Sequence, residues 1–166
     1  LLLIKHHFAP SPILSALTVD HALRKTSAAE ARQVKSWCKT HGIKHTTLKW
    51  QHGEITTGIQ AKARAARYQL MADYCVKHKI TALLTAHTKD DQAETVAMRM
   101  ARTSSTKSLS AIWPETEVGG LVILRPLLSA RREQLRGYLT ANNQAWLEDP
   151  SNTDPRFERV RLRGAG

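Results

Sequence analysis

The sequence predicts an α/β fold, a doubly wound parallel sheet with helices on both faces. Two observations lead to this class. Short apolar runs of strand length alternate along the 166 residues with longer segments of helical periodicity. Acidic residues and histidines also follow directly after two of the apolar runs. Ligands bind such a sheet outside the carboxyl ends of its strands, so these residues are the first candidates for a site.

The first elements are expected in residues 13–48. Residues 13–19 (ILSALTV) are mostly apolar and predict a buried strand. Ser27 and Glu30 have capping-box spacing, which predicts the start of a helix, and Gly42 is expected to end that helix as its C-terminal cap. Residues 43–48 predict the second strand.

Residues 59–79 predict a long helix, followed by a strand at 80–86 and a further helix at 90–102. The long helix carries apolar side chains at helical spacing, and the predicted buried stripe is Ile59, Ala63, Ala66, Leu70 and Tyr74.

The last third of the chain predicts shorter elements. Residues 103–110 read as a Ser-, Thr- and Lys-rich loop without glycine, and residues 121–124 as a fourth strand. Ser129 is expected to cap a helix that runs to about Asn142, and residues 149–152 (DPSN) predict a turn.

Charge and composition limit the function classes. There are 25 Lys and Arg against 14 Asp and Glu, a net charge of +11. A polyanionic partner explains this charge, although a merely soluble basic protein explains it equally well. With 9 aromatic residues, a base-stacking platform is not indicated. No apolar run is long enough to span a bilayer and no targeting segment is evident, so a cytoplasmic location is expected.

Two cysteines, Cys38 and Cys75, lie far apart within helix-like sequence. They form no disulfide framework and no C-x-x-C pair for a metal or cluster. We expect both to be small core residues.

An acidic cluster lies where the third strand gives way to a helix. His87, Asp90, Asp91 and Glu94 are spaced so that a helix starting near residue 88 gathers them on one face. Three neighbouring carboxylates repel one another unless a cation is present, and Mg²⁺ or a substrate ammonium group would meet that need. A capping box between Thr88 and Asp91 is the structural alternative, and it leaves His87 and Glu94 unexplained.

Two basic groups complete the candidates. Arg64 and Arg67 are three residues apart on the long helix, where a solvated face is an equally good interpretation. In the tail, Arg156, Arg159 and Arg163 would share a face if helical, and arginine suits bidentate phosphate contact.

Five segments in order resemble the signature of the tRNA(Ile)-lysidine synthetase family, within the N-type ATP pyrophosphatases. They are residues 19–24 (VDHALR), 63–68 (ARAARY), 86–95 (AHTKDDQAET), 125–128 (RPLL), and 146–152 (WLEDPSN) with 159–163 (RVRLR). The resemblance covers about residues 13–163. It implies an adenine nucleotide alpha hydrolase-like fold, with residues 1–125 as the catalytic core and residues 126–166 as its helical end leading to a linker.

The resemblance also implies a reaction. Such enzymes use ATP to adenylate C2 of the first anticodon cytidine in an isoleucine tRNA with anticodon CAU, and free L-lysine then displaces AMP. Asp91 and Glu94 would serve lysine or Mg²⁺, with His87 and Asp90 beside the nucleotide. A further set of residues would contact nucleotide, phosphate or substrate: Asp20, His21, Arg64, Arg67, Arg159 and Arg163. A homodimer is compatible with the sequence, which does not reveal the oligomeric state.

The sequence departs from the family pattern in two places. The family's first strand and S-G-G-x-D-S phosphate loop are not in these residues, and residues 1–3 correspond to the helix that follows that loop. We therefore expect a fragment that is inactive by itself. The family's glycine-rich loop reads RTSSTKSL at residues 102–109, without glycine. The alternatives are another ATP pyrophosphatase, such as a tRNA thiolation enzyme, or a non-catalytic RNA-binding relic.

Overall fold

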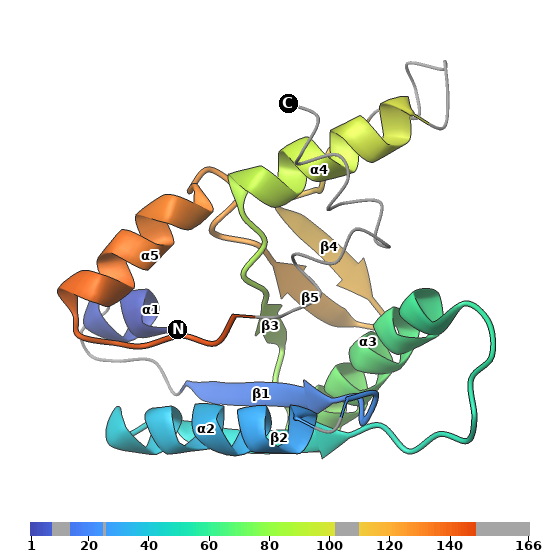
Figure 1. Cartoon of the computed structure of the whole chain (residues 1–166), viewed down its shortest axis with the longest axis horizontal. Coiled ribbons are helices and arrows are strands. Elements are labelled where there is room, and N and C mark those ends of the chain that lie inside the picture. Colours follow the sequence, from blue (N-terminus) through green and yellow to red (C-terminus); the bar gives the residue numbers. More distant parts are fainter. Residues whose placement is uncertain (8–13, 25, 102–109, 149–166) are drawn as a thin grey trace. The chain divides into compact units, whose positions relative to one another are not determined.

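The computed structural model describes residues 1–7, 14–24, 26–101 and 110–148. The chain divides into two compact units, Leu1–Lys79 and Ile80–Gly166, which we call the first and second units. Each contains parallel strands and helices, which confirms the α/β class (Figure 1). The division at residue 79 separates two compactly folded units. The boundary expected at residue 125 divides the chain by family role and stays a prediction.

The first unit is built around two parallel strands. Its elements are α1 (Leu2–His7), β1 (Ser15–Asp20), α2 (Ser27–Thr40), β2 (Lys44–Lys49) and α3 (Ile59–Lys77). β1 and β2 pair in register from Ser15 with Lys44 to Asp20 with Lys49. Both strands therefore end at the same edge, where Asp20 and the residues after Lys49 come together. The helix expected over the first residues is present as α1.

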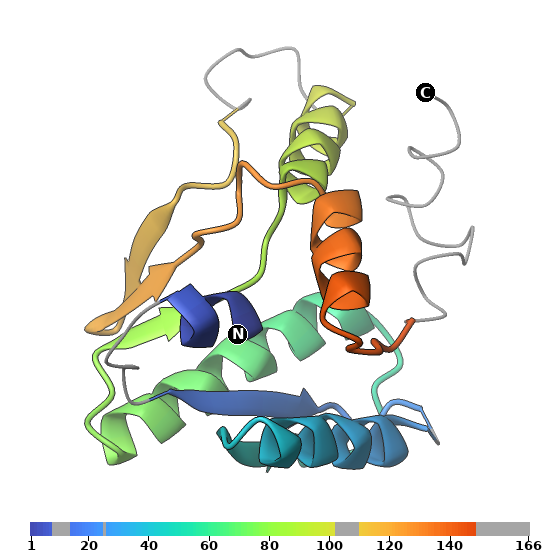
Figure 2. The same cartoon turned by 90° about the vertical axis from the view of Figure 1, so that its left-hand side faces the viewer.

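Two helices pack on this pair of strands. α2 packs against both β1 and β2, and α3 packs against β1 (Figure 2). The buried stripe of α3 differs from the predicted one. Ala63 is buried as expected, but Ile59 is 41% exposed and the deepest side chains are Met71 and Cys75. Ala66, Leu70 and Tyr74 are half-buried at the margin. α3 packs chiefly on β1 and reaches β2 through the Tyr74 hydroxyl, which lies 3.1 Å from Thr46 Oγ1.

The start of α2 corrects one prediction. Thr26, one residue before the predicted Ser27, is the N-cap, and it makes no side-chain bond to the helix backbone. Its hydroxyl donates to Glu30 Oε1 instead (2.9 Å), while the Ser27 hydroxyl donates to the carbonyl oxygen of Arg24 (2.9 Å). Glu30, the acid expected to complete a capping box, thus accepts a hydrogen bond from the side chain of Thr26.

The end of α2 confirms the glycine cap. Gly42 has φ +62° and its N–H donates to the carbonyl oxygen of Lys39 (3.0 Å). The next N–H, that of Ile43, donates to the carbonyl oxygen of Cys38 (2.8 Å). These two bonds form a Schellman motif, which satisfies carbonyl groups at the end of the helix and sends the chain into β2.

The second unit contains a mixed sheet. Its elements are β3 (Ala82–Leu84), α4 (Lys89–Met100), β4 (Glu115–Val118), β5 (Leu121–Leu124) and α5 (Arg132–Ala141). The strand order is β3-β5-β4, with β3 and β5 parallel and β4 antiparallel to β5. The core of this sheet is formed by Leu121 and Ile123, which are 3% and 2% exposed.

The sequence predicts a purely parallel sheet, and the antiparallel strand β4 was not expected. Gly119 and Gly120 have φ of +58° and +79°, the left-handed pair that a two-residue hairpin turn requires. The hairpin folds the short, charged segment ETEV back along β5 as an edge strand. An antiparallel edge strand of this kind is common on otherwise parallel sheets.

α5 begins later than predicted. Arg131 is its N-cap, so the expected cap at Ser129 is wrong. The Arg131 N–H donates to Gln134 Oε1 (2.8 Å), and the next N–H, of Arg132, donates to Asp90 Oδ2 of α4 (2.8 Å). Acceptors three residues ahead and on another helix determine where α5 starts. Among the described residues, no helix is both long and apolar enough to cross a membrane.

We predict that Gly42→Ala lowers the free energy of unfolding by about 1–2 kcal/mol, because alanine must adopt a left-handed conformation there. Gly53→Ala is the matched control, since a methyl group at Gly53 meets nothing within 4 Å and its φ is not positive. Urea denaturation of both variants measures the difference. Equal stability of the two variants would contradict the assigned role of Gly42.

Candidate active site

In the first unit, Asp20 ties down the loop that follows β1. Its side chain is 8% exposed, and Oδ1 accepts a hydrogen bond from the N–H of Ala22 (2.9 Å). The hydroxyl of Ser27 and this N–H hold the pKa of Asp20 below its usual range. Asp20 is therefore an ionised carboxylate whose described partners belong to the protein itself.

Ala22 takes a conformation that suits glycine. Its φ is +53°, in the left-handed region, and it occupies the position that is glycine in the V-D-H-G-L-R pattern. The hydrogen bond to Asp20 holds the backbone in this strained turn. The turn carries the preceding residue, His21, at the carboxyl edge of the strand pair.

His21 and Arg67, both predicted site residues, contact each other. Arg67 donates from Nε (3.2 Å) and Nη2 (3.0 Å) to His21 Nε2, so the imidazole proton lies on Nδ1. Burial first and Arg67 second lower the pKa of His21, which keeps the ring neutral. His21 Nδ1 has no hydrogen-bond partner within the described parts of the chain. A neutral histidine thus presents a buried N–H donor at this edge.

Two aromatic side chains beside His21 were not predicted as site residues. The rings of Trp50 and His52 lie 4.2 Å apart, and Trp50 meets the His21 ring edge to face at 5.9 Å. The backbone N–H of Trp50 donates a hydrogen bond to the backbone carbonyl oxygen of Asp20 (2.9 Å). Trp50 directly follows β2, so the rule that parallel strands end at one edge could have identified it. Arg64 lies apart from this group, with its guanidinium 5.1 Å from the Tyr68 ring.

In the second unit, the acidic segment begins α4 with a capping box. The N–H of Thr88 donates to Asp91 Oδ2 (2.7 Å), and the N–H of Asp91 donates to Thr88 Oγ1 (3.4 Å). This confirms the structural interpretation of that pair. Asp91 Oδ1 takes no part in these bonds and faces α5.

Arg132 supplies the cation that the carboxylates need. Its Nη2 lies 3.6 Å from Asp91 Oδ1 and 3.7 Å from Glu94 Oε1, although Glu94 is only 8% exposed. Both distances exceed normal hydrogen bonds, so the contacts are ion pairs through space. Nothing in the sequence spacing pointed to Arg132, which lies about forty residues away.

Asp90 and His87 turn to other partners. Asp90 Oδ2 accepts the N–H of Arg132 at the start of α5, and this bond is the main reason that the pKa of Asp90 is lowered. His87 Nδ1 lies 2.9 Å from Thr85 Oγ1. The structure thus brings Asp91 and Glu94 to one cation, while Asp90 caps a helix and His87 bonds at the end of β3.

A further motif residue, Gln92, has a structural role. Its side-chain amide bonds both ways with the backbone of Ile112, at 2.9 Å and 2.6 Å. Arg125 supports the same segment by donating from Nη1 to the carbonyl oxygen of Trp113 (2.8 Å). Parts of the family-like motifs therefore hold the unit together around the acidic residues.

The described residues do not form a magnesium cage. Residues 1–7, 14–24, 26–101 and 110–148 contain no group of three or more His, Cys, Asp or Glu side chains that could hold a metal ion. Asp91 and Glu94 alone converge, and they already face Arg132. The predicted residues Arg159 and Arg163, and the loop at 103–109, lie outside the described residues.

Both cysteines are core residues, as predicted. Cys38 in α2 and Cys75 in α3 are free, and 5% and 1% exposed. Burial raises the pKa of each thiol, which disfavours the thiolate needed for sulfur chemistry.

The chain matches known proteins along nearly its whole length. A protein-family profile described as "PP-loop domain" matches residues 1–165. The tRNA(Ile)-lysidine synthase of Rhodopseudomonas palustris is 47% identical over 152 residues, which are 92% of this chain and 44% of that protein. The enzyme of the same name from Mesorhizobium japonicum is 45% identical over 174 residues, covering 99% of this chain and 38% of the relative. The chain thus spans less than half the length of these curated relatives.

One solved structure shares the fold. The U34-tRNA thiolase of Methanococcus maripaludis, solved with its [4Fe-4S] cluster, aligns with a TM-score of 0.78 at 14% identity. The alignment covers 99% of this chain and 58% of the thiolase. At this identity the likeness concerns the fold alone, and it agrees with the predicted α/β class.

Asp90→Ala should lower the free energy of unfolding by about 1 kcal/mol at neutral pH, because the N–H of Arg132 loses its acceptor. The lowered pKa means that the ionised carboxylate stabilises the folded state above the pKa of the unfolded chain. This contribution is lost as pH falls through the folded value, so the difference from wild type should shrink below the ordinary value of 3.8. Asp90→Asn keeps an acceptor and should stay near wild type at neutral pH. Denaturation curves at several pH values measure this. Equal loss in both variants would argue against the capping role.

Ala22→Gly should raise the free energy of unfolding by about 0.5 kcal/mol, because relief of the left-handed strain exceeds the entropy cost of glycine. The same change at exposed Ala65 within α3 should lower it by about 1 kcal/mol. Chemical denaturation should show changes of opposite sign in the free energy of unfolding of the two variants. A loss of stability in Ala22→Gly would mean that the turn carries no strain.

Proposed function

The chain belongs to the PP-loop domain family, and on this basis we propose that the protein containing it is a tRNA(Ile)-lysidine synthetase. Two relatives with this name are 47% and 45% identical over at least nine-tenths of the chain. The five family-like segments also occur in the expected order. Membership of the PP-loop family implies ATP use.

The proposed substrates are ATP, free L-lysine and an isoleucine tRNA with anticodon CAU, in the cytoplasm. The C2 oxygen of the first anticodon cytidine attacks the α-phosphorus of ATP, and pyrophosphate leaves. The lysine ε-amine, after losing a proton, then attacks C2. A C2–N bond forms, the C2–O bond breaks and AMP leaves with the oxygen.

The observation that carries this proposal is the ion pairing around Arg132. Asp91 Oδ1 and Glu94 Oε1 both face one guanidinium nitrogen, at 3.6 Å and 3.7 Å. The guanidinium stands in for an ammonium group of the same charge. Because both contacts are longer than hydrogen bonds, an arriving lysine could compete for the carboxylates at modest cost. We infer that the pair holds and orients lysine for attack.

Each unit contains its own candidates for nucleotide contact. His21, with its Nδ1–H donor, and Arg67 are the candidates at the strand edge of the first unit. Asp20 holds the turn that carries His21, whereas Arg64, the remaining candidate on α3, lies against the Tyr68 ring. His87 and Asp90 remain candidates beside the nucleotide, and Arg159 and Arg163 remain candidates for phosphate contact. Mg²⁺ is expected to arrive with ATP, held mainly by its phosphates and by water.

The thiolation alternative is weakened by the cysteines. A sulfur-transfer enzyme of the catalytic-cysteine type needs accessible thiolates, whereas Cys38 and Cys75 are buried with raised pKa values. A protein that binds RNA without catalysis remains the second candidate. Measurement of lysine transfer separates it from the enzyme.

Asp91→Asn should abolish lysine transfer while tRNA binding stays within a few-fold of wild type. The amide keeps an oxygen for the Thr88 N–H but removes the charge that holds a cation. The assay is ATP-dependent transfer of labelled lysine into the CAU isoleucine tRNA, with the full-length protein. Glu133→Gln is the matched control, an exposed acid-to-amide change on α5 that should leave transfer unchanged.

Two outcomes would count against the proposal. Wild-type transfer by Asp91→Asn would remove the role assigned to this carboxylate. No transfer by the wild-type protein, with tRNA still bound, would favour an RNA-binding protein or another ATP pyrophosphatase.

A further inference from the structure

The positive charge of this protein is concentrated in the first unit. Residues 1–79 contain 13 Lys and Arg against 4 Asp and Glu, a net charge of +9. Residues 80–166 contain 12 against 10, a net charge of +2. The acidic cluster lies in the nearly neutral unit. A charge that served solubility alone would have no reason to gather in one half of the chain.

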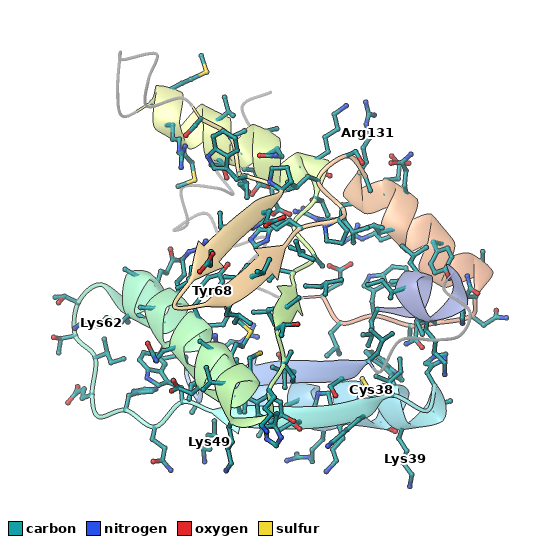
Figure 3. All side chains as sticks on the ribbon, turned by 180° about the vertical axis from the view of Figure 1, so that it is seen from behind. Cys38, Lys39, Lys49, Lys62, Tyr68 and Arg131 are labelled. Atoms are coloured by element: carbon teal, nitrogen blue, oxygen red, sulfur yellow. The ribbon has the colours of Figure 1, made fainter. Side chains whose placement is uncertain are left out.

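Much of this charge lines one groove between α2 and β2. The side chains Arg32, Lys35 and Lys39 are spaced i, i+3 and i+7, which places them on one face of α2. Lys44 and His45 line the groove from β2, and no acidic residue lines it. We call these five residues the basic groove: Arg32, Lys35, Lys39, Lys44 and His45. Figure 3 shows Lys39 directed away from the unit, while the neighbouring Cys38 points into it.

The cations of the groove have no neutralising partner among the described residues. In the parts of the chain that the structure describes, no carboxylate forms an ion pair with the groove's arginine or lysines. Glu30, the acid of α2, is paired with Arg24 outside the groove (2.8 Å). His45 bonds Thr18 through Nε2 (2.8 Å), and its Nδ1 has no partner among the described residues. The groove therefore offers several cations to a ligand.

The basic groove is separate from the candidate nucleotide edge. Lys44 pairs with Ser15 at the amino ends of β2 and β1, whereas Asp20 and His21 follow the carboxyl end of β1. Five residues of extended strand separate the two ends, about 16 Å. A nucleotide held at His21 would therefore not occupy the groove.

We propose that the basic groove binds the phosphate backbone of the substrate RNA, away from the cytidine that reacts. The inference rests on the proposed function for the identity of the RNA as a tRNA. The cations of α2 extend over about 10 Å of helix, more than one phosphate group can neutralise. The groove is open, and its lining carries four cationic side chains and no acidic one, which suits contact with a backbone rather than reading of bases.

An anionic membrane fits the groove less well. A helix that lies on a membrane needs an exposed apolar face opposite its charges. In α2, Ala31 and Cys38 are instead buried, Val34 and Trp37 are half-buried, and the helix packs on β1 and β2. The exposed long side chains of α2 are therefore mainly its charged ones.

The test compares two triple variants of the full-length protein. The groove variant is Arg32→Gln, Lys35→Gln and Lys39→Gln. The control variant, Lys62→Gln, Lys77→Gln and Lys79→Gln, removes the same charge from exposed residues of the first unit outside the groove. Affinity for a transcript of the CAU isoleucine tRNA is measured over a salt series, for each variant and for the wild type.

We expect the groove variant to bind the tRNA at least tenfold more weakly at about 0.1 M salt, and its salt slope to fall by about 2–3 if three phosphate contacts are lost. The control should stay within about threefold of wild type with an unchanged slope. A charge-preserving variant, Arg32→Lys with Lys35→Arg and Lys39→Arg, should bind like wild type. Equal weakening of groove and control variants, or no weakening of either, would overturn the proposal.

Lysine transfer separates this inference from the proposed function. If the groove holds RNA away from the reacting cytidine, the groove variant should raise KM for the whole tRNA and leave kcat at saturating tRNA unchanged. A loss of kcat with unchanged binding would overturn the proposal. If the wild-type protein transfers no lysine, the proposed function fails, while the binding measurements still decide whether the groove holds RNA.

Discussion

The second unit depends on the contacts of one arginine. The backbone N–H of Arg132 donates a hydrogen bond to the carboxylate of Asp90, and the side chain of Arg132 faces Asp91 and Glu94. One residue thereby joins the start of α5 to α4 and places a positive charge between two carboxylates that repel each other. The carboxylates of the acidic segment are therefore already arranged around a cationic group.

The first unit rests on a different constraint, the parallel pairing of two strands. Because β1 and β2 end together, Asp20, His21 and Trp50 meet at one edge, and Arg67 of α3 reaches the same place. The amino ends of the strands carry the basic groove instead. One pair of strands therefore separates two kinds of anion-attracting surface, one beside a neutral histidine and one lined by cations that pair with no described carboxylate.

Several site features could be anticipated from local pattern, and others could not. The capping box of Thr88 and Asp91 and the left-handed cap at Gly42 follow from short-range geometry, and both are found. The start of α5 was misplaced because its acceptors are Gln134 and, on another helix, Asp90. The edge strand β4 was missed because a segment of four residues with one apolar side chain, Val118, carries little strand signal.

Three features could be recognised in the unfolded chain: the alternation of strands and helices, the family-like motifs in their order, and the excess of basic residues. They are properties of neighbouring residues and of composition, and no fold is needed to see them. Folding was required to show that Arg132 faces the acidic cluster, that Arg67 contacts His21, and that the lysines of α2 and β2 line one groove. Such contacts join residues far apart in the chain, and side-chain spacing carries no information about them until the chain has folded.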